Sequence, residues 1–348
     1  MTLVYETGLD VGARRRAQGK INEDNVAVNL LEDGHLDRCR GAGVFVLADG
    51  AGGENAGDVA SHIASVEIAQ RLTQTLWDLR SFEEGRARSA ELPSGETDWM
   101  LARIETVVRS THTRLLQRIG ELGLGDAYTT VVVGVTVGTR LYYAWVGDSR
   151  LYVVNSHPTR ADSRAVSHLT RDHSIVERLR QQGQIDDIEA QVHPQSNRVT
   201  RALGGTADED PAASTVQVET SHARLFGDDT LVFTSDGLVD AYTDAPALHE
   251  RYQNADDPAA VEAEILERSV TDDEIRDIVL ETGSLSTATD RLVDLANRRG
   301  GADNLSLILC RNSGLDRSPA TGFPDRTYRT DADPLGNDPT IVRDTDSL

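Results

Sequence analysis

Lysine and cysteine are nearly absent from this chain of 348 residues. Lys20 is its only lysine, so 34 of the 35 basic residues are arginine, while acidic residues number 57 and the net charge is −22. So acidic a surface repels nucleic-acid phosphates and anionic lipid, which argues against either as a partner. The composition also favours a halophilic, cytoplasmic protein, because molar salt screens the self-repulsion of such a surface. A genomic preference for GC-rich codons would replace lysine by arginine, but by itself it does not explain the acidic excess.

The two cysteines, Cys39 and Cys310, lie far apart and have no metal-ligand spacing, so the sequence predicts neither a disulfide framework nor a zinc site. No apolar run approaches the roughly 18 residues of a membrane-spanning helix, and the first residues contain no apolar segment typical of a signal peptide. We therefore expect a soluble chain with no membrane partner. The sequence also lacks a Gly-Lys-Ser/Thr phosphate loop, which argues against nucleotide binding.

The order of apolar patterns predicts an α+β fold. Short β-branched or aromatic runs predict strands, and apolar residues at helical spacing predict helices. Tight turns join three consecutive strands, which must therefore be antiparallel. The expected strands are 26–31, 43–48, 129–138, 140–146, 150–154, 230–235 and 305–310, and the expected helices are 56–79, 99–119, 174–185, 259–270, 271–282 and 287–299.

Carboxylates recur where these strands begin or end. Asp49 and Asp236 each follow a strand and precede glycine, and Asp303 immediately precedes a strand. Each one alone is typical of a solvated turn. Together, carboxylates at one end of a sheet repel one another and resist burial unless divalent cations neutralise them, and an all-oxygen ligand set suits Mg²⁺ or Mn²⁺. Similar positions are held by Glu23, Asp24 and Asp148.

Eight short motifs carry a resemblance to a known family. They are NED at 22–24, DGAGG at 49–53, YTTVVVGV at 128–135, VGDSR at 146–150, LTRDHS at 169–174, HP with RVTRALGG within 193–205, SDGLVD at 235–240 and GADN at 301–304. In this order the chain resembles the metal-dependent protein serine/threonine phosphatases (PPM, or type 2C) in their short prokaryotic form. The resemblance implies a β-sandwich of two antiparallel sheets flanked by helices on both faces, with metals at one end.

The resemblance also implies two Mn²⁺ or Mg²⁺ ions, with a third metal site at Asp148 and Asp236. Asp49 matches the carboxylate that bridges two metals, and the Gly50 carbonyl matches a ligand of one of them. A water activated by two such cations would attack the phosphate in line, without a covalent intermediate. The implied metal ligands are Asp49, Gly50, Asp236, Asp303, Glu23, Asp24 and Asp148.

The sequence departs from the family where a substrate-binding arginine is expected. Gly19 lies four residues before Glu23, at the position of that arginine, and Lys20 lies three before it. The developing charge on the phosphate needs a cation, and Lys20 and Arg16 are our candidates, with Arg14 and Arg15 as alternatives. The expected catalytic set is therefore Asp49, Asp236, Asp303 and Lys20. A second departure is Ala51, where other members carry histidine or methionine.

We expect a catalytic domain over 1–312, a disordered acidic tail over 313–348 and an acidic helical insertion near 244–286 at the rim of the site. The expected function is hydrolysis of phosphoserine and phosphothreonine in proteins, with a cognate serine/threonine kinase as partner and a monomeric state. Two alternatives stay open, because a fold and its metals do not decide the substrate. One is a catalytically weak phosphoprotein-binding regulatory module, and the other is a binuclear metallohydrolase of small phosphate esters.

Overall fold

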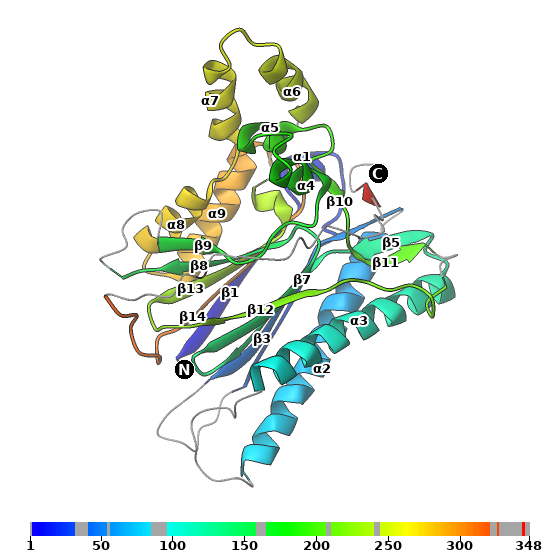
Figure 1. Ribbon diagram of the computed structural model, residues 1–348, viewed down its shortest axis with the longest axis vertical. Coiled ribbons are helices and arrows are strands. Elements are labelled where there is room, and N and C mark those ends of the chain that lie inside the picture. Colours follow the sequence, from blue (N-terminus) through cyan, green and yellow to red (C-terminus); the bar gives the residue numbers. More distant parts are fainter. Residues whose placement is uncertain are drawn as a thin grey trace.

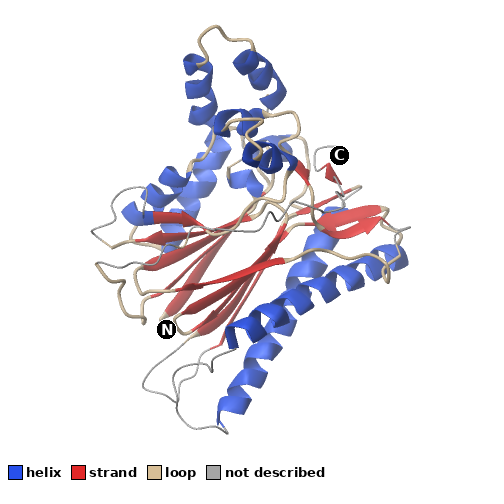
Figure 2. Ribbon diagram, in the orientation of Figure 1, coloured by secondary structure: helices blue, strands red, loops and turns tan. Residues whose placement is uncertain are grey.

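Two antiparallel sheets pack face to face, and helices cover both outer faces (Figures 1 and 2). This computed structural model describes residues 2–31, 41–53, 56–84, 96–157, 165–206, 210–239, 244–320, 326 and 343–344. The four-layer arrangement confirms the fold expected from the motifs. Among the described residues, every helix is too short or too polar to cross a bilayer. Cys310 is buried and free, and Cys39 lies outside the described residues.

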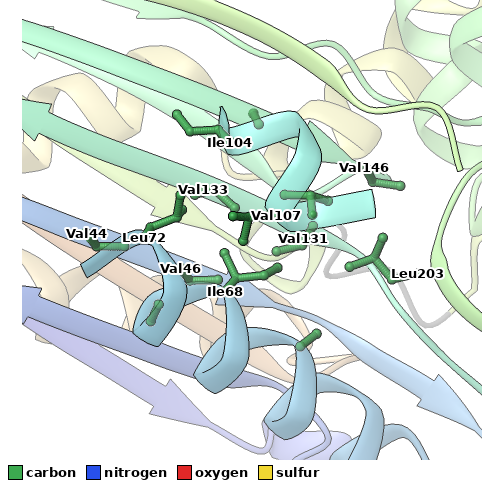
Figure 3. Close-up of a cluster of buried hydrophobic side chains, with 14 of the residues drawn as sticks. Val44, Val46, Ile68, Leu72, Ile104, Val107, Val131, Val133, Val146 and Leu203 are labelled. Carbon is green, nitrogen blue, oxygen red and sulfur yellow. The ribbon is translucent and has the colours of Figure 1, made fainter. Parts of the chain in front are cut away.

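The first sheet has the strand order β12-β7-β6-β3-β2. Its strands are β2 (Asn25–Leu31), β3 (Ala42–Ala48), β6 (Val131–Val137), β7 (Arg140–Val146) and β12 (Glu219–Arg224). Its outer face is covered by α2 (Ala56–Glu84) and α3 (Glu96–Leu122). Val44 and Val46 of β3 meet Ile68 and Leu72 of α2 in a fully apolar layer (Figure 3).

The second sheet has the order β1-β14-β13-β8-β9. Its strands are β1 (Leu3–Asp10), β8 (Arg150–Asn155), β9 (Val166–His168), β13 (Asp229–Thr234) and β14 (Leu305–Asn312). Its outer face is covered by α8 (Asp272–Glu281) and α9 (Leu285–Arg299). Between the sheets, Phe45 stacks on Phe233 with ring centroids 5.8 Å apart. Strands buried on both faces explain why the run at 43–48 is continuously apolar and why the run at 305–310 is apolar except for Ser306.

Shorter elements gather at one end of the sandwich. They are α1 (Ala13–Ala17), β4 (Gly50–Gly52), β5 (Asp126–Thr129), α4 (Ile175–Gln181), α5 (Asp187–Val192), β10 (Arg198–Val199), β11 (Leu203–Thr206), a 3₁₀ turn (Asp236–Leu238) and β15 (Arg343–Asp344). The strands β11, β5 and β4 form a small third sheet, and β10 pairs with β15. Helix α4 lies within the helix expected over 174–185. The sequence pattern did not predict β1, β12 or the other short elements, because their polar residues break the apolar periodicity.

The helices expected over 244–286 are present, and they belong to two packing units. The helices α6 (Ala245–Gln253) and α7 (Ala259–Arg268) project with α5 above the sandwich (Figure 1). Their shared core consists of Leu248, Val261 and Ile265 against Val192 of α5. Helix α8 instead buries Ile275 and Ile278 against the second sheet. Only α6 and α7 therefore form a surface subdomain.

The chain beyond β14 stays packed on the domain for longer than its composition predicted. Ser318 donates to the Asp228 carboxylate at 2.8 Å. Further along, Arg326 is buried and pairs with Asp229 at 2.9 Å, with both side chains only 2% exposed. The remaining tail residues, apart from 343–344, lie outside the described residues.

Candidate active site

Antiparallel pairing brings the acidic strand ends to one edge of the sandwich. The start of β2 lies beside the end of β3, because Asn25 pairs with Ala48. The end of β13 lies beside the start of β14 in the same way, because Thr234 pairs with Leu307. Asp24, Asp49, Asp236 and Asp303 flank these strand ends, and Asp148 occupies the turn between β7 and β8.

Asp49 lies at the centre of this acidic group. Burial raises the pKa of its carboxyl well above the usual range, and the charges of Asp24, Asp236, Asp303 and Asp148 raise it further. Its main-chain carbonyl accepts hydrogen bonds from the Thr130 N–H at 2.8 Å and the Thr129 hydroxyl at 2.7 Å. The backbone of Asp49 is thus fixed, while its carboxylate faces four others.

The turn after Asp49 brings its backbone close to two neighbouring segments. A Cβ atom on Gly50 would lie 2.1 Å from the Gly57 carbonyl oxygen and 2.4 Å from that of Glu23. Only glycine allows this approach, in which β4 runs against the start of α2. Gly50 therefore lies where the sequence motif required it, directly beside the Glu23–Asp24 segment.

Asp24 is a second buried carboxylate with excess negative charge around it. Burial, together with the nearby charge of Asp303, raises the pKa of its side chain to about 6. The Ser306 hydroxyl donates to Oδ2 at 2.7 Å, while Oδ1 is buried and accepts no hydrogen bond among the described residues. A buried oxygen of this kind fits a cation ligand.

Arg15 is the basic side chain that lies among these carboxylates. Its guanidinium donates to Glu23 Oε2 at 2.5 Å and to Asp303 Oδ1 at 2.6 Å. Helix α1 is fixed against the segment before β14, because the Arg14 N–H donates to the Gly301 carbonyl at 3.0 Å. Burial is the main cause that raises the pKa of Glu23, and the Arg15 charge opposes it.

The other basic candidates lie further out. The Arg16 side chain is 57% exposed and pairs with Asp10 at 2.5 Å. Lys20 is exposed, and its charge acts on Glu23 with a smaller effect than that of Arg15. Arg15, which was only an alternative from the sequence, is the one that the structure brings to the carboxylates.

The donor set fits a hard divalent cation in its chemistry, with carboxylate oxygens, a close backbone carbonyl and a buried unbonded oxygen on Asp24. No three acidic, histidine or cysteine side chains in the described part of the chain converge closely enough to coordinate one ion as they stand. The Coulomb interactions that shift the Asp49 pKa act over longer distances than coordination does, so the two observations are compatible. Arg15 binds two of these carboxylates, so a cation bound by Glu23 or Asp303 would replace or share an Arg15 contact.

Comparison with known proteins decides the family. Residues 11–267 match the family model described as protein phosphatase 2C. The chain belongs to the protein phosphatase 2C family. It is 29% identical over 307 residues to the serine/threonine phosphatase Stp of Listeria welshimeri, covering 87% of this chain and 96% of that protein. This chain is therefore a serine/threonine phosphatase of the type 2C class, as its motifs indicated.

Solved structures support the same assignment. The Streptococcus agalactiae serine/threonine phosphatase is 27% identical, with a TM-score of 0.57 over 89% of this chain and 99% of that one. The catalytic domain of the phosphatase PstP in complex with two manganese ions shares the fold at 22% identity, with a TM-score of 0.54 over 89% of this chain and 97% of that one. Type 2C phosphatases are metal-dependent, which agrees with the acidic strand ends.

Sequence reasoning left out several residues that hold the site together. Asn304 accepts the Glu23 N–H at 2.9 Å and donates to the carbonyls of Val11 and Ile21 at 3.1 and 3.3 Å. It thereby joins the loop before β2 to the start of β14. Its position in the GADN motif was a usable signal, whereas Ser306 lies in an apolar strand and had none.

Proposed function

We propose that the buried acidic group at the end of the sandwich holds two divalent cations, Mn²⁺ or Mg²⁺. Asp49, Asp236 and Asp303 would be the principal ligands, with the Gly50 carbonyl beside them. Glu23 and Asp24 would hold coordinated water, and Asp148 would serve a third ion. The observation that carries this proposal is the burial of Asp49 at the strand ends that also hold Asp24, Asp236 and Asp303; this burial first, and the neighbouring carboxylates next, raise the pKa of its carboxyl. Two cations, when bound, lower the pKa of water and neutralise phosphate charge.

We further propose that Arg15 holds the substrate phosphate. Its guanidinium is positioned by a docked helix and lies between Glu23 and Asp303, whereas Lys20 is exposed and Arg16 is turned toward Asp10. A planar guanidinium binds phosphate through two parallel hydrogen bonds. To do so here, Arg15 would exchange one or both carboxylate partners for phosphate oxygens, which links substrate binding to the charge of the acidic group.

The substrates are phosphorylated proteins, and we propose a cognate serine/threonine kinase as the source of the phosphate. We propose that the protein is a monomer. We also propose that it lies in the cytoplasm, which the acidic, lysine-poor composition supports. Small phosphate esters could be hydrolysed at the same proposed metal site. A comparison of turnover on small esters and on phosphoproteins therefore decides between these two substrate classes.

Hydrolysis of matched phosphothreonine, phosphoserine and phosphotyrosine peptides, alongside p-nitrophenyl phosphate, tests this proposal. With Mn²⁺ or Mg²⁺ in molar KCl, we expect the first two peptides to be preferred over phosphotyrosine. Equal turnover of all phosphate esters would instead indicate a general phosphomonoesterase.

The phosphate contact is tested by Arg15→Gln, with Arg16→Gln and Lys20→Gln as matched controls. We expect Arg15→Gln to lower kcat/KM by about 100-fold, as loss of a charged contact to phosphate implies. The controls should stay within a few-fold of the wild type. A larger loss in either control than in Arg15→Gln would assign the phosphate to that residue instead.

A further inference from the structure

A segment of five residues, 169–173, forms hydrogen bonds to both sides of the turn that contains Asp148. The Leu169 N–H donates to the Leu151 carbonyl at 2.8 Å, and Trp145 Nε1 donates to the Arg171 carbonyl at 2.7 Å. Asp172 accepts two hydrogen bonds from Arg150 Nε at 3.1 Å and a third from its Nη2 at 2.6 Å. We call residues 169–173 the strap. It contacts β7 before the Asp148 turn and β8 after it.

His173 ends the strap and binds the turn directly. Its N–H donates to the Gly147 carbonyl at 3.0 Å, and its ring Nδ1 accepts the Gly147 N–H at 3.1 Å. The ring is 2% exposed and stacks on Trp145 with centroids 6.0 Å apart. Both polar groups of the residue before Asp148 are thus held by one histidine.

The ring is neutral, and its proton position follows from this contact. Burial is the main cause that lowers the pKa of His173. Because an N–H can only donate, Nδ1 accepts, and the proton of the neutral ring lies on Nε2. The Nε2 proton faces Glu219 Oε1 at 3.7 Å, and Arg201 Nη1, which lies 3.2 Å from Nε2, donates to the same Glu219 oxygen at 3.0 Å and not to the protonated Nε2.

His173 also lies where the two ends of a helical segment, residues 174–199, come together. We call this segment the flap. The Thr200 N–H donates to the His173 carbonyl at 2.7 Å, and Ser174 forms a β-bridge with Val199. The flap contains α4 and α5, and α5 packs on α6 and α7 (Figure 1). Tyr252 of α6 donates to Asp186 at 2.9 Å, at the start of α5. A continuous set of contacts therefore runs from the subdomain through the flap to His173.

We propose that His173 is a positioning residue that couples the flap to the metal-binding orientation of Asp148. This inference rests on the proposed role of Asp148 as a metal ligand. Gly147 has φ +107°, and a Cβ there would lie 2.5 Å from Thr130 Cβ, so the turn has no space to relax toward the first sheet. Removal of the His173 Nδ1 acceptor leaves the buried Gly147 N–H without a hydrogen bond. It also removes the contact that holds the turn on the side away from Thr130. Movement of the flap base shifts the same ring.

The test compares His173→Asn with His173→Gln, two amides that differ by one methylene. The Asn Oδ1 lies where Nδ1 lies and can accept the Gly147 N–H, whereas the Gln amide lies near the position of Nε2. We expect the hydrogen-exchange rate of the Gly147 amide to rise at least tenfold in His173→Gln and to stay near the wild-type rate in His173→Asn. Residues that support a metal ligand typically change metal affinity by about 10- to 100-fold. The Mn²⁺ concentration that gives half-maximal activity should rise by this factor in His173→Gln alone.

A double-mutant cycle with Asp148→Asn separates coupling from general destabilisation. If His173 acts through Asp148, His173→Gln should change the Mn²⁺ requirement less than twofold in the Asp148→Asn background. Mn²⁺ should also slow hydrogen exchange in peptides of the flap in the wild type, because coupling is reciprocal. It should not do so in His173→Gln or in Asp148→Asn.

Independent, additive effects of the two substitutions would overturn the inference and leave the metal role of Asp148 intact. So would equal Gly147 exchange rates in His173→Asn and His173→Gln. A wild-type Mn²⁺ requirement in Asp148→Asn would refute Asp148 as a metal ligand, and the coupling to it would fall as well.

Discussion

In the metal-free protein, Asp24 should contribute more stability as the pH falls from 7.5 to 4.5. Asp24 has a pKa of about 6 in the fold against 3.8 for an unperturbed carboxyl, because it is buried among other carboxylates. A raised native pKa means that the native state binds the proton more tightly than the unfolded state does. The stabilisation is therefore complete below pH 3.8 and is lost as the pH rises through about 6.

The size of this effect follows from the pKa difference. It corresponds to about 3 kcal/mol in total, of which about 2 kcal/mol falls between pH 4.5 and 7.5. Asp49, whose pKa is also raised, acts in the same direction. Carboxyls with lowered pKa values, such as Asp172 and Asp228, act oppositely and mainly below this window. Buried histidines act oppositely within it: burial lowers the pKa of His168 to about 4, so the fold loses stability as the pH falls through 6.5 toward 4. The Asp24 contribution is therefore measured as the difference between the wild type and a variant with the same histidines.

Urea unfolding followed by tryptophan fluorescence, in EDTA and molar KCl, measures the effect. Asp24→Asn is the control, because it removes the titrating group and keeps the side-chain shape. Between pH 7.5 and 4.5, the free energy of unfolding of the wild type should change by about 2 kcal/mol more in the stabilising direction than that of Asp24→Asn. Saturating Mn²⁺ should stabilise the wild type more at pH 7.5 than at pH 4.5, since cations bind the deprotonated carboxylates. Identical pH slopes of the wild type and Asp24→Asn in EDTA would refute the reasoning.

Three further predictions follow from other parts of the molecule. The melting temperature should rise with KCl well beyond ordinary ionic strength, because the net charge is −22, and a melting temperature independent of KCl would contradict this. Arg326→Met should lower the free energy of unfolding by about 3 kcal/mol, since it leaves Asp229 buried without its charged partner, and urea denaturation at neutral pH would detect it. Replacing 245–268 by a short Gly/Ser linker should preserve hydrolysis of p-nitrophenyl phosphate and weaken activity on a phosphoprotein. The two ends of this segment lie near each other, because the Arg268 side chain pairs with Asp244 at 2.6 Å, so a short linker can join them. Equal losses on both substrates would make α6 and α7 merely structural.

Much of the fold could be predicted from the sequence because the sandwich strands are buried on both faces. The run at 43–48 is apolar throughout, and β3 has all seven residues buried between a helix layer and the other sheet. Strand β12 could not be recognised, because at the edge of its sheet five of its six residues are partly buried or exposed. The division of 244–286 into two units also escaped the sequence, since similar amphipathic patterns in α7 and α8 face different partners.

For the site, the sequence indicated which carboxylates would meet but not which cation lies among them. Strand-end positions place Asp49, Asp236 and Asp303 together once the antiparallel pairing is known. The choice among the basic residues 14–16 and Lys20 depends on how α1 docks against Gly301, a contact between distant segments. The role of the strap was hidden for the same reason, because His173 meets Gly147 only in the folded chain.

The most direct test of the central claim is calorimetric titration of Mn²⁺ into the wild type and Asp49→Asn, with phosphothreonine-peptide hydrolysis on the same samples. The wild type should bind at least two ions and lose activity in EDTA, while Asp49→Asn should keep its fold by circular dichroism and lose both tight binding and nearly all turnover. Wild-type turnover in folded Asp49→Asn, or full activity of the wild type in EDTA, would contradict a metal centre built on these carboxylates.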